Sequence, residues 1–232
     1  MKTLYNFYII HQRKYRENSL LVHIFTREFG KISAVMNASK KKINLYQPLV
    51  KLKGDIRLAK NHDGLAKIYN IELMESFYQK SYINLLSLQY INELIYLLLS
   101  YSHEEAVLFD KYDFILKNIN DTNYKYLLRM FELELLNSLG RGIYPNVDID
   151  GELIQDETFY TILPEGFKKS FGLDKNIILG RSIKKINQPI NFWTSEDLKA
   201  ISRVTKVCID SVLAGRQLES RKLLINFLNI KK

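Results

Sequence analysis

The residues whose types and spacing could carry chemistry in this sequence are five acids that lie close together. They occupy a segment rich in Pro and Gly and comprise Asp148, Asp150, Glu152, Asp156 and Glu157. Carboxylates grouped in this way can hold the metal ions of a nuclease. Alternating acids in a segment flanked by Pro and Gly are more typical of a solvated loop. We favour the loop and keep a metal-dependent nuclease as a minor alternative.

Other patterns for catalysis or metal binding are weak. Gly30-Lys31 lacks the preceding glycine that a phosphate-binding loop needs. The four histidines do not have the spacing of zinc ligands: His11, His23, His62 and His103. The single cysteine, Cys208, excludes an internal disulfide and lies in an apolar helical pattern that predicts burial. We therefore predict no catalytic residue, no cofactor and no metal, and we do not expect an enzyme.

Positive charge is concentrated in the first third of the chain. Residues 1–80 hold 15 of the 34 Lys and Arg but 6 of the 25 Asp and Glu, so they carry the whole net charge of +9. Segregated charge indicates a surface for a polyanion. The candidate DNA-binding residues are Arg13, Lys14, Arg16, Arg27, Lys31, Lys40, Lys41, Lys42, Lys51, Lys53 and Arg57. A solvated face that protects a sheet edge is the plainer alternative.

Three aromatic residues accompany these cations: Tyr15, Phe29 and Tyr46. In channels for single-stranded nucleic acid, cations follow the phosphates and aromatic rings stack on bases, at about 1–3 kcal/mol per base. The combination favours nucleic-acid binding over a merely solvated face.

Short strands are expected to position this surface. Leu20, Val22 and Ile24 alternate with their neighbours in a two-faced strand, and Gly30 supplies the turn to the next strand. With these two, residues 4–11, 49–58 and 65–73 make five predicted strands. In 49–58 the apolar side should include Leu58 and the solvent side Asp55. Five short antiparallel strands predict a small barrel, an OB-fold first and an SH3-like barrel second.

Helices follow residue 76, at 81–100, 104–119, 124–139, 194–213 and 218–228. Gly140 is placed to end the third of them, and Thr194 with Asp197 forms a capping box for the fourth. Residues 142–188 are irregular and should hold a short hairpin and loops. We predict an α+β multidomain fold: an OB-fold domain at 1–78, a helical domain at 79–141 and 192–232, and a small insert at 142–191.

Three segments of the sequence carry a resemblance to a known family. They are YRENSLLVHIFTREFGKISAVMNASKK from Tyr15, RMFELELLNSLG from Arg129 and LAGRQLESR from Leu213. In this order and at this spacing they resemble the RecO family of bacterial recombination mediators. Asn37-Ala38-Ser39 departs from the family, which has glycine after the alanine.

The resemblance implies an OB-fold, a helical domain and an insert that holds zinc with four cysteines in many members. Residues 142–188 contain no Cys, so we expect no zinc. The resemblance also implies a role in DNA repair and recombination: binding single- and double-stranded DNA, annealing strands without ATP, and acting with RecR. An OB-fold RNA-binding factor is the alternative. Because no apolar run approaches the roughly 20 residues of a membrane span, we expect a cytoplasmic, nucleoid-associated protein without a membrane partner.

Members of the family are expected to bind the acidic C-terminal tail of single-stranded-DNA-binding protein, which ends in an apolar aromatic residue. A site for that tail needs an apolar pocket beside cations. Arg129, Arg203 and Lys206 are the candidates, if the helices that carry them pack side by side. The alternative is that Arg129 only pairs with a carboxylate such as Glu132 or Glu134 at the surface.

Overall fold

The computed structural model describes residues 3–37, 46–59, 64–101, 103–171 and 176–230. Contacts divide the chain into two units, Met1–Asp121 with Leu218–Lys232, and Thr122–Gln217. The predicted helices are thus shared between two units, and the predicted division into three domains stays a prediction. No described helix combines the length and the apolar composition that crossing a membrane requires.

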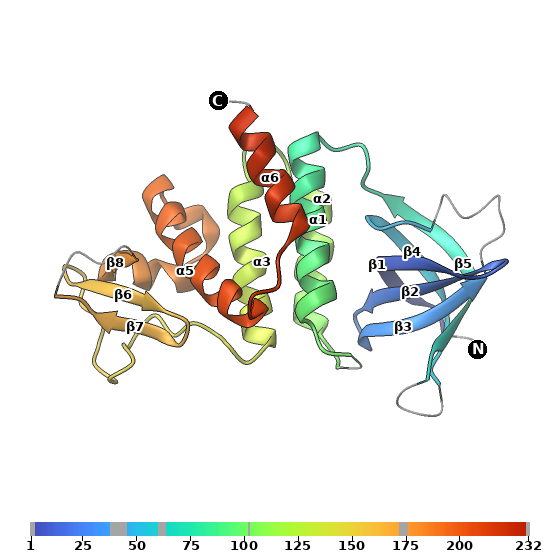
Figure 1. Cartoon of the computed structure of the whole chain (residues 1–232), viewed down its shortest axis with the longest axis horizontal. Helices are drawn as coiled ribbons and strands as arrows, with labels where there is room; N and C mark the ends of the chain where they lie inside the picture. The colour runs from blue at the N-terminus through green and yellow to red at the C-terminus, as the bar shows by residue number, and fades with distance from the viewer. Residues whose placement is uncertain (1–2, 38–45, 60–63, 102, 172–175, 231–232) are drawn as a thin grey trace. The chain divides into compact units, whose positions relative to one another are not determined.

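Five strands of the first unit close into a barrel (Figure 1). Around the barrel the order is β1 (Tyr5–Arg16), β2 (Ser19–Thr26), β3 (Gly30–Asn37), β5 (Ala66–Ser76) and β4 (Val50–Arg57). Neighbouring strands are antiparallel, except that β3 and β5 pair in parallel. A closed five-stranded barrel followed by helices is the arrangement of an OB-fold protein with a helical part. The predicted fold class is confirmed.

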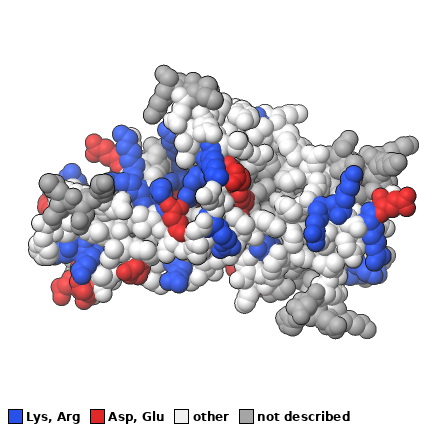
Figure 2. All heavy atoms as spheres, viewed as in Figure 1, with Lys and Arg blue, Asp and Glu red and all other residues white. Residues whose placement is uncertain are grey.

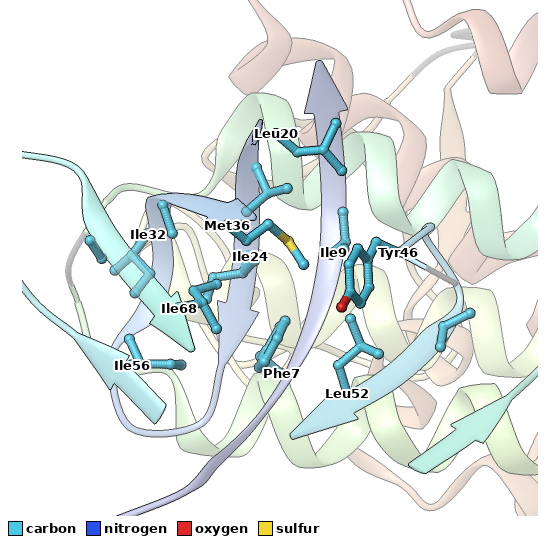
Figure 3. Close-up of a cluster of buried hydrophobic side chains, with 14 residues drawn as sticks. Phe7, Ile9, Leu20, Ile24, Ile32, Met36, Tyr46, Leu52, Ile56 and Ile68 are labelled. Atoms are coloured by element: carbon cyan, nitrogen blue, oxygen red, sulfur yellow. The ribbon is translucent and has the colours of Figure 1, made fainter. Parts of the chain in front are cut away.

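Alternating apolar side chains fill the barrel (Figure 3). Leu20, Val22 and Ile24 of β2 are buried because successive side chains of a strand lie on opposite faces. Each pairs with an inward residue of β3: Met36, Ala34 and Ile32, respectively. The alternation of apolar residues in the sequence therefore predicts which side chains of β2 and β3 lie in the core.

The strand β4 follows its predicted faces only in part. Leu52 and Ile56 lie in the core, as expected. The pattern also predicts Leu58 in that core, but Leu58 lies beyond the last residue of β4 and is 53% exposed. Asp55 is predicted to face solvent, but its carboxylate is buried and accepts a hydrogen bond from Arg57 at 3.1 Å. The ion pair of Asp55 and Arg57 thus buries a carboxylate that the pattern placed on the solvent-exposed face of β4.

The turn between β2 and β3 requires glycine. Gly30 has φ +59°, and a Cβ there would lie 1.8 Å from the backbone oxygen of His103. The Thr26 hydroxyl closes the turn, since it accepts from the backbone N–H of Phe29 at 2.9 Å and donates to the carbonyl of Gly30 at 3.2 Å. The predicted role of Gly30 is confirmed.

Three helices complete the first unit: α1 (Tyr82–Leu98), α2 (Ala106–Asn118) and α6 (Glu219–Ile230). The Glu93 carboxylate of α1 accepts hydrogen bonds from the backbone N–H groups of Glu219 at 3.0 Å and Ser220 at 2.9 Å. It thereby satisfies two of the N–H groups that the first turn of a helix leaves unbonded. The start of α6 is fixed to α1 in this way.

An acid on α2 joins that helix to the barrel. Asp113 accepts hydrogen bonds from the Tyr8 hydroxyl and from the ammonium of Lys51, both at 2.5 Å, and from Lys117 at 2.6 Å. Burial raises the pKa of Asp113, but the bonds from Lys117, Lys51 and Tyr8 outweigh it and lower that pKa below its usual value. The Asp113 carboxylate is therefore ionised in the folded protein at neutral pH.

The second unit combines helices with a small sheet. Its elements are α3 (Tyr124–Ser138), β6 (Phe159–Leu163), β7 (Gly166–Lys169), β8 (Ile177–Leu179), α4 (Gly180–Lys184), η2 (Lys185–Asn187), η3 (Ile190–Phe192) and α5 (Ser195–Leu213). The sheet has the order β7-β6-β8, so the insert holds three strands where a hairpin is predicted. The third strand has only three residues, which is too short for an alternating pattern to reveal.

The predicted helix ends of this unit are confirmed. Thr194 and Asp197 form the capping box of α5, each side chain accepting from the backbone N–H of the other. Gly140 has φ +67° after α3, with Arg141 N–H bonded to the carbonyl of Leu136 at 2.8 Å. This is the Schellman arrangement, which a left-handed glycine permits.

Candidate nucleic-acid interface

Lys31 is the predicted DNA-binding residue that the barrel buries. Its side chain starts on β3, and the residue is 2% exposed. The ammonium donates to the backbone carbonyl of Tyr96 at 2.8 Å and lies 4.4 Å from the ring centroid of Tyr101. A cation enclosed in this way cannot reach a phosphate, so Lys31 is excluded from the interface.

Three other predicted cations are held by carboxylates. Arg27 binds Asp110 of α2 through Nε at 3.0 Å, and Lys51 binds Asp113 at 2.5 Å. Arg57 is paired with Asp55 and also lies 4.7 Å from the ring centroid of Tyr69. Each of these charges is already partly neutralised, so a phosphate would gain less from it than from a cation without a carboxylate.

Three of the four remaining predicted cations of the described barrel lie at the end of β1. Arg13, Lys14 and Arg16 are exposed and form no ion pair with another described residue. Tyr15, 43% exposed, lies among them, and the Arg16 guanidinium is 5.2 Å from its ring centroid. We call Arg13, Lys14, Tyr15 and Arg16 the β1 cluster. Figure 2 shows Lys and Arg side chains spread over the face in view, with Asp and Glu side chains among them.

Lys53 is the other predicted cation without a carboxylate partner in the described part of the chain. It lies on β4 and is partly exposed. The lysine triplet Lys40, Lys41 and Lys42 lies outside the described residues, and its role stays a prediction.

The predicted stacking residues have different environments. Tyr15 presents its ring to solvent, as described above. Phe29 instead packs edge-on against Tyr5, with centroids 4.9 Å apart. Tyr46 is 5% exposed in the barrel core, so it is not available to a base, and its predicted role is wrong (Figure 3).

The three residues predicted to bind a partner tail do not form one site. Arg129 donates to Glu132 at 2.6 Å, the pairing that the sequence left open, but Glu132 is buried and not at the surface as that alternative predicted. Lys206 pairs with Asp210 at 2.6 Å. Arg203 is exposed at a cleft of about 480 Å³. Its other walls include the cations Arg181 and Lys185 and the apolar Phe159, Ile177 and Leu179.

The acids of the insert have structural partners. Asp148 accepts from the backbone N–H groups of Asp150 and Glu152, at 3.0 and 2.9 Å, and so holds its own loop. Asp156 pairs with Lys184 at 2.6 Å. Among the described residues, no group of three His, Cys, Asp or Glu is placed to hold a metal ion. The arrangement supports the loop interpretation of these acids.

Cys208 is a core residue, as predicted. It is 4% exposed on α5, and burial raises the pKa of its thiol to about 11. Because the thiolate is the nucleophilic form, the side chain is inert at neutral pH.

A five-stranded OB barrel with a cluster of exposed cations, followed by helices and a small sheet, defines an OB-fold protein of the nucleic-acid-binding kind. Two family models match nearly the whole chain: "Recombination protein O N terminal" over residues 1–77 and "Recombination protein O C terminal" over residues 79–222. The chain belongs to the Recombination protein O family.

Several curated relatives bear the name DNA repair protein RecO. The protein from Francisella tularensis subsp. novicida is 70% identical over 232 residues, the full length of both chains. That from Francisella philomiragia subsp. philomiragia is 67% identical over the same length. The protein from Vibrio vulnificus is 30% identical over 94% of this chain and 91% of its own. The family predicted from the three sequence segments is thus confirmed.

Proposed function

We propose that this chain is a non-enzymatic DNA-repair protein that binds single- and double-stranded DNA and anneals complementary strands without ATP. With RecR it would help to load recombinase on DNA coated by single-stranded-DNA-binding protein. The observation that carries the proposal is the β1 cluster, three exposed cations and an exposed tyrosine at the end of one strand of an OB barrel. Membership of a family whose curated relatives are named for DNA repair supports it. Such a protein would act in the cytoplasm at the nucleoid.

The cluster suits a strand of DNA for physical reasons. Cations without carboxylate partners can neutralise phosphates and release the counterions bound to DNA, which drives association. The exposed ring of Tyr15 offers a stacking face that tolerates any base. Neither feature distinguishes one sequence from another, as annealing of arbitrary complementary strands requires.

The test is annealing of complementary strands coated with single-stranded-DNA-binding protein, without nucleotide. The wild-type chain should anneal them, and a variant with Arg13, Lys14 and Arg16 changed to Ala should lose most of this activity. In a control variant, Lys125, Lys184 and Lys222 are changed to Ala, which removes the same amount of charge. These three lysines are exposed and lie far from β1 in the sequence. Equal loss in both variants, or preference for structured RNA with no annealing of coated DNA, would refute the proposal. The second result would favour an RNA-binding factor.

We also propose that the cleft beside Arg203 receives the acidic tail of single-stranded-DNA-binding protein. The cleft combines cations with apolar walls, the two features that such a tail needs. Its lining also holds Glu196 and Asp197, but the Asp197 carboxylate is bonded to Thr194, and three cations face the cleft. Arg129 is left out because its guanidinium is bound to Glu132. Changing Arg203 to Glu should abolish binding of a tail peptide while binding of naked DNA stays near wild type, and the same change at Lys206, which pairs with Asp210, tests whether that residue takes part. Parallel loss of both activities would contradict this division of roles.

A further inference from the structure

A second cleft, of about 440 Å³, lies in the first unit where β1 and the start of β4 meet α1. Its walls include the apolar side chains of Ile10, Leu49 and Leu97. This volume lies within the range of pockets for small organic groups. Within the described residues, the walls of this cleft include none of the predicted DNA-binding cations.

Two aromatic rings form one wall of this cleft. His11 and Tyr96 are stacked, with centroids 4.6 Å apart and planes inclined by 20°. Burial, and then the charge of Arg13, lower the pKa of His11 below its usual value, so its ring is neutral at pH 7. A neutral stacked pair provides a flat apolar surface that is formed before any ligand arrives.

Several polar groups of the cleft come from α1. Gln89, Glu93 and Tyr96 follow one another at helical spacing along one side of α1. The Glu93 carboxylate is engaged by the N–H groups that begin α6, so it is not presented as a bare anion. Gln89 is exposed and offers an amide that can both donate to and accept from the edge of a base.

The wall formed by Leu49 is held in a strained conformation. Leu49 has φ +62°, in the left-handed region that branched side chains avoid. The backbone N–H of Phe77 donates to its carbonyl at 3.0 Å, and its side chain is 2% exposed. Strain of this kind persists only where the surrounding contacts enforce it, and it concentrates at binding sites.

The cleft adjoins the β1 cluster. His11 and Arg13 pair with His23 and Leu21, respectively, so their side chains leave β1 on the same face. Arg13 is close enough for its charge to affect His11. A phosphate held by Arg13 would therefore bring the adjoining base to the mouth of the cleft.

We propose that this cleft receives one unstacked base of single-stranded DNA whose phosphates lie along the β1 cluster. The inference rests on the proposed function and adds to it a specific base site. The acidic tail discussed above would also combine an aromatic ring with negative charge, but we propose the cleft beside Arg203 for that tail. DNA accounts for both the apolar walls and the adjoining cations.

The test compares the binding of two polymers of equal length, oligothymidine and an abasic oligomer with the same phosphates. The wild-type chain should bind oligothymidine more tightly. Tyr96→Ala should weaken oligothymidine binding by roughly five- to a hundredfold, the range that loss of one stacked base gives, and leave abasic binding unchanged. Tyr96→Phe keeps the ring and should retain wild-type affinity. The hydrogen bond from Lys31 goes to the backbone oxygen of Tyr96, so that bond survives both changes.

A variant that fills the cleft covers the case in which Tyr96→Ala does not fold. Gln89→Trp places a ring at the exposed edge of the cleft, and Gln89→Ala is its matched control. The Trp variant should lose the whole preference for bases, and the Ala variant should lose only the part that hydrogen bonds of the Gln89 amide contribute. Equal wild-type affinity for the two polymers, or equal loss for both in the variants, would overturn the base site alone. Binding of neither polymer by the wild type would overturn the proposed function, and the base site with it.

Discussion

The ammonium of Lys31 donates a hydrogen bond to the backbone carbonyl of Tyr96, 65 positions later in the chain, across 2.8 Å. Lys31 belongs to the barrel and Tyr96 to α1, so this bond joins the two elements. Lys31, which the charge pattern assigned to a basic surface, therefore connects the barrel to α1 inside the protein.

The first prediction concerns the stability that Lys31 provides. Lys31→Met keeps much of the apolar stem but removes the charged donor, so the free energy of unfolding should fall by about 1.5–3 kcal/mol, the range for a hydrogen bond from a charged group. Urea unfolding measures this change. The salt dependence of DNA binding should stay as in the wild type. A flatter salt dependence in this variant would return Lys31 to the DNA interface.

The second prediction compares two sets of three cations. Changing Arg13, Lys14 and Arg16 to Ala should flatten the plot of log K against log salt by about 0.7 for each phosphate of single-stranded DNA that the variant no longer neutralises. Changing Lys40, Lys41 and Lys42 tests in the same way the lysine triplet that the sequence singled out. Fluorescence anisotropy at several salt concentrations gives both slopes. A triple variant with the wild-type slope would exclude its three residues from phosphate contact.

The third prediction concerns the pH dependence of stability. Burial lowers the pKa of His23, with further contributions from His11, Lys31 and Arg13, and burial also lowers the pKa of His11. The unfolded chain therefore binds protons near pH 6.5 that the folded chain does not. Stability should be fully present above that pH and should decrease as pH falls through 6.5 toward the lowered values.

Chemical unfolding at a series of pH values from 8 to about 5 measures this effect. His23→Gln should remove part of the decrease, because the unfolded chain then has one fewer group to protonate. An identical pH dependence in this variant would show that His23 is not responsible.

The fourth prediction concerns zinc. Because residues 142–188 contain no Cys, purified protein should hold no stoichiometric zinc, and a chelator should leave its thermal midpoint unchanged. Packing and hydrogen bonds must supply the stability instead. Trp193 is 6% exposed, and its indole N–H donates to the carbonyls of Lys185 at 2.8 Å and Gln188 at 3.1 Å. Trp193→Phe should destabilise the protein by about 1–3 kcal/mol, since two hydrogen bonds of about 0.5–1.5 kcal/mol each are lost. One zinc ion per chain in the purified protein would contradict the prediction that it holds no zinc.

The barrel could be predicted because its pattern is local. The alternation of Leu20, Val22 and Ile24 indicates a strand within five positions, and the turn at Gly30 follows a few residues later. The same reasoning failed at Asp55, because the arginine that covers its carboxylate neutralises a group that the pattern assigned to water. It also failed at Tyr46, since a single aromatic residue outside a strand has no period to show which way it points.

The site could be predicted only as a region. Counting charges located the basic third of the chain, but the counts do not show which cations have partners. Arg27 and Lys51 bind carboxylates of α2 that lie far from them in the sequence. The stacked pair of His11 and Tyr96 escapes prediction for the same reason, because no spacing connects two residues that only the folded chain brings together.

The bond between Glu93 and the start of α6 has a consequence for the order of synthesis. Glu93 leaves the ribosome well before Ser220, so for most of translation its carboxylate has no helix to hold. The surface of α1 that α6 covers stays uncovered over the same interval. Partly synthesised chains expose apolar surface of this kind and are prone to association. Chaperones can therefore bind the uncovered surface of α1 in the nascent chain until α6 emerges, although all strands of the barrel have been synthesised by then.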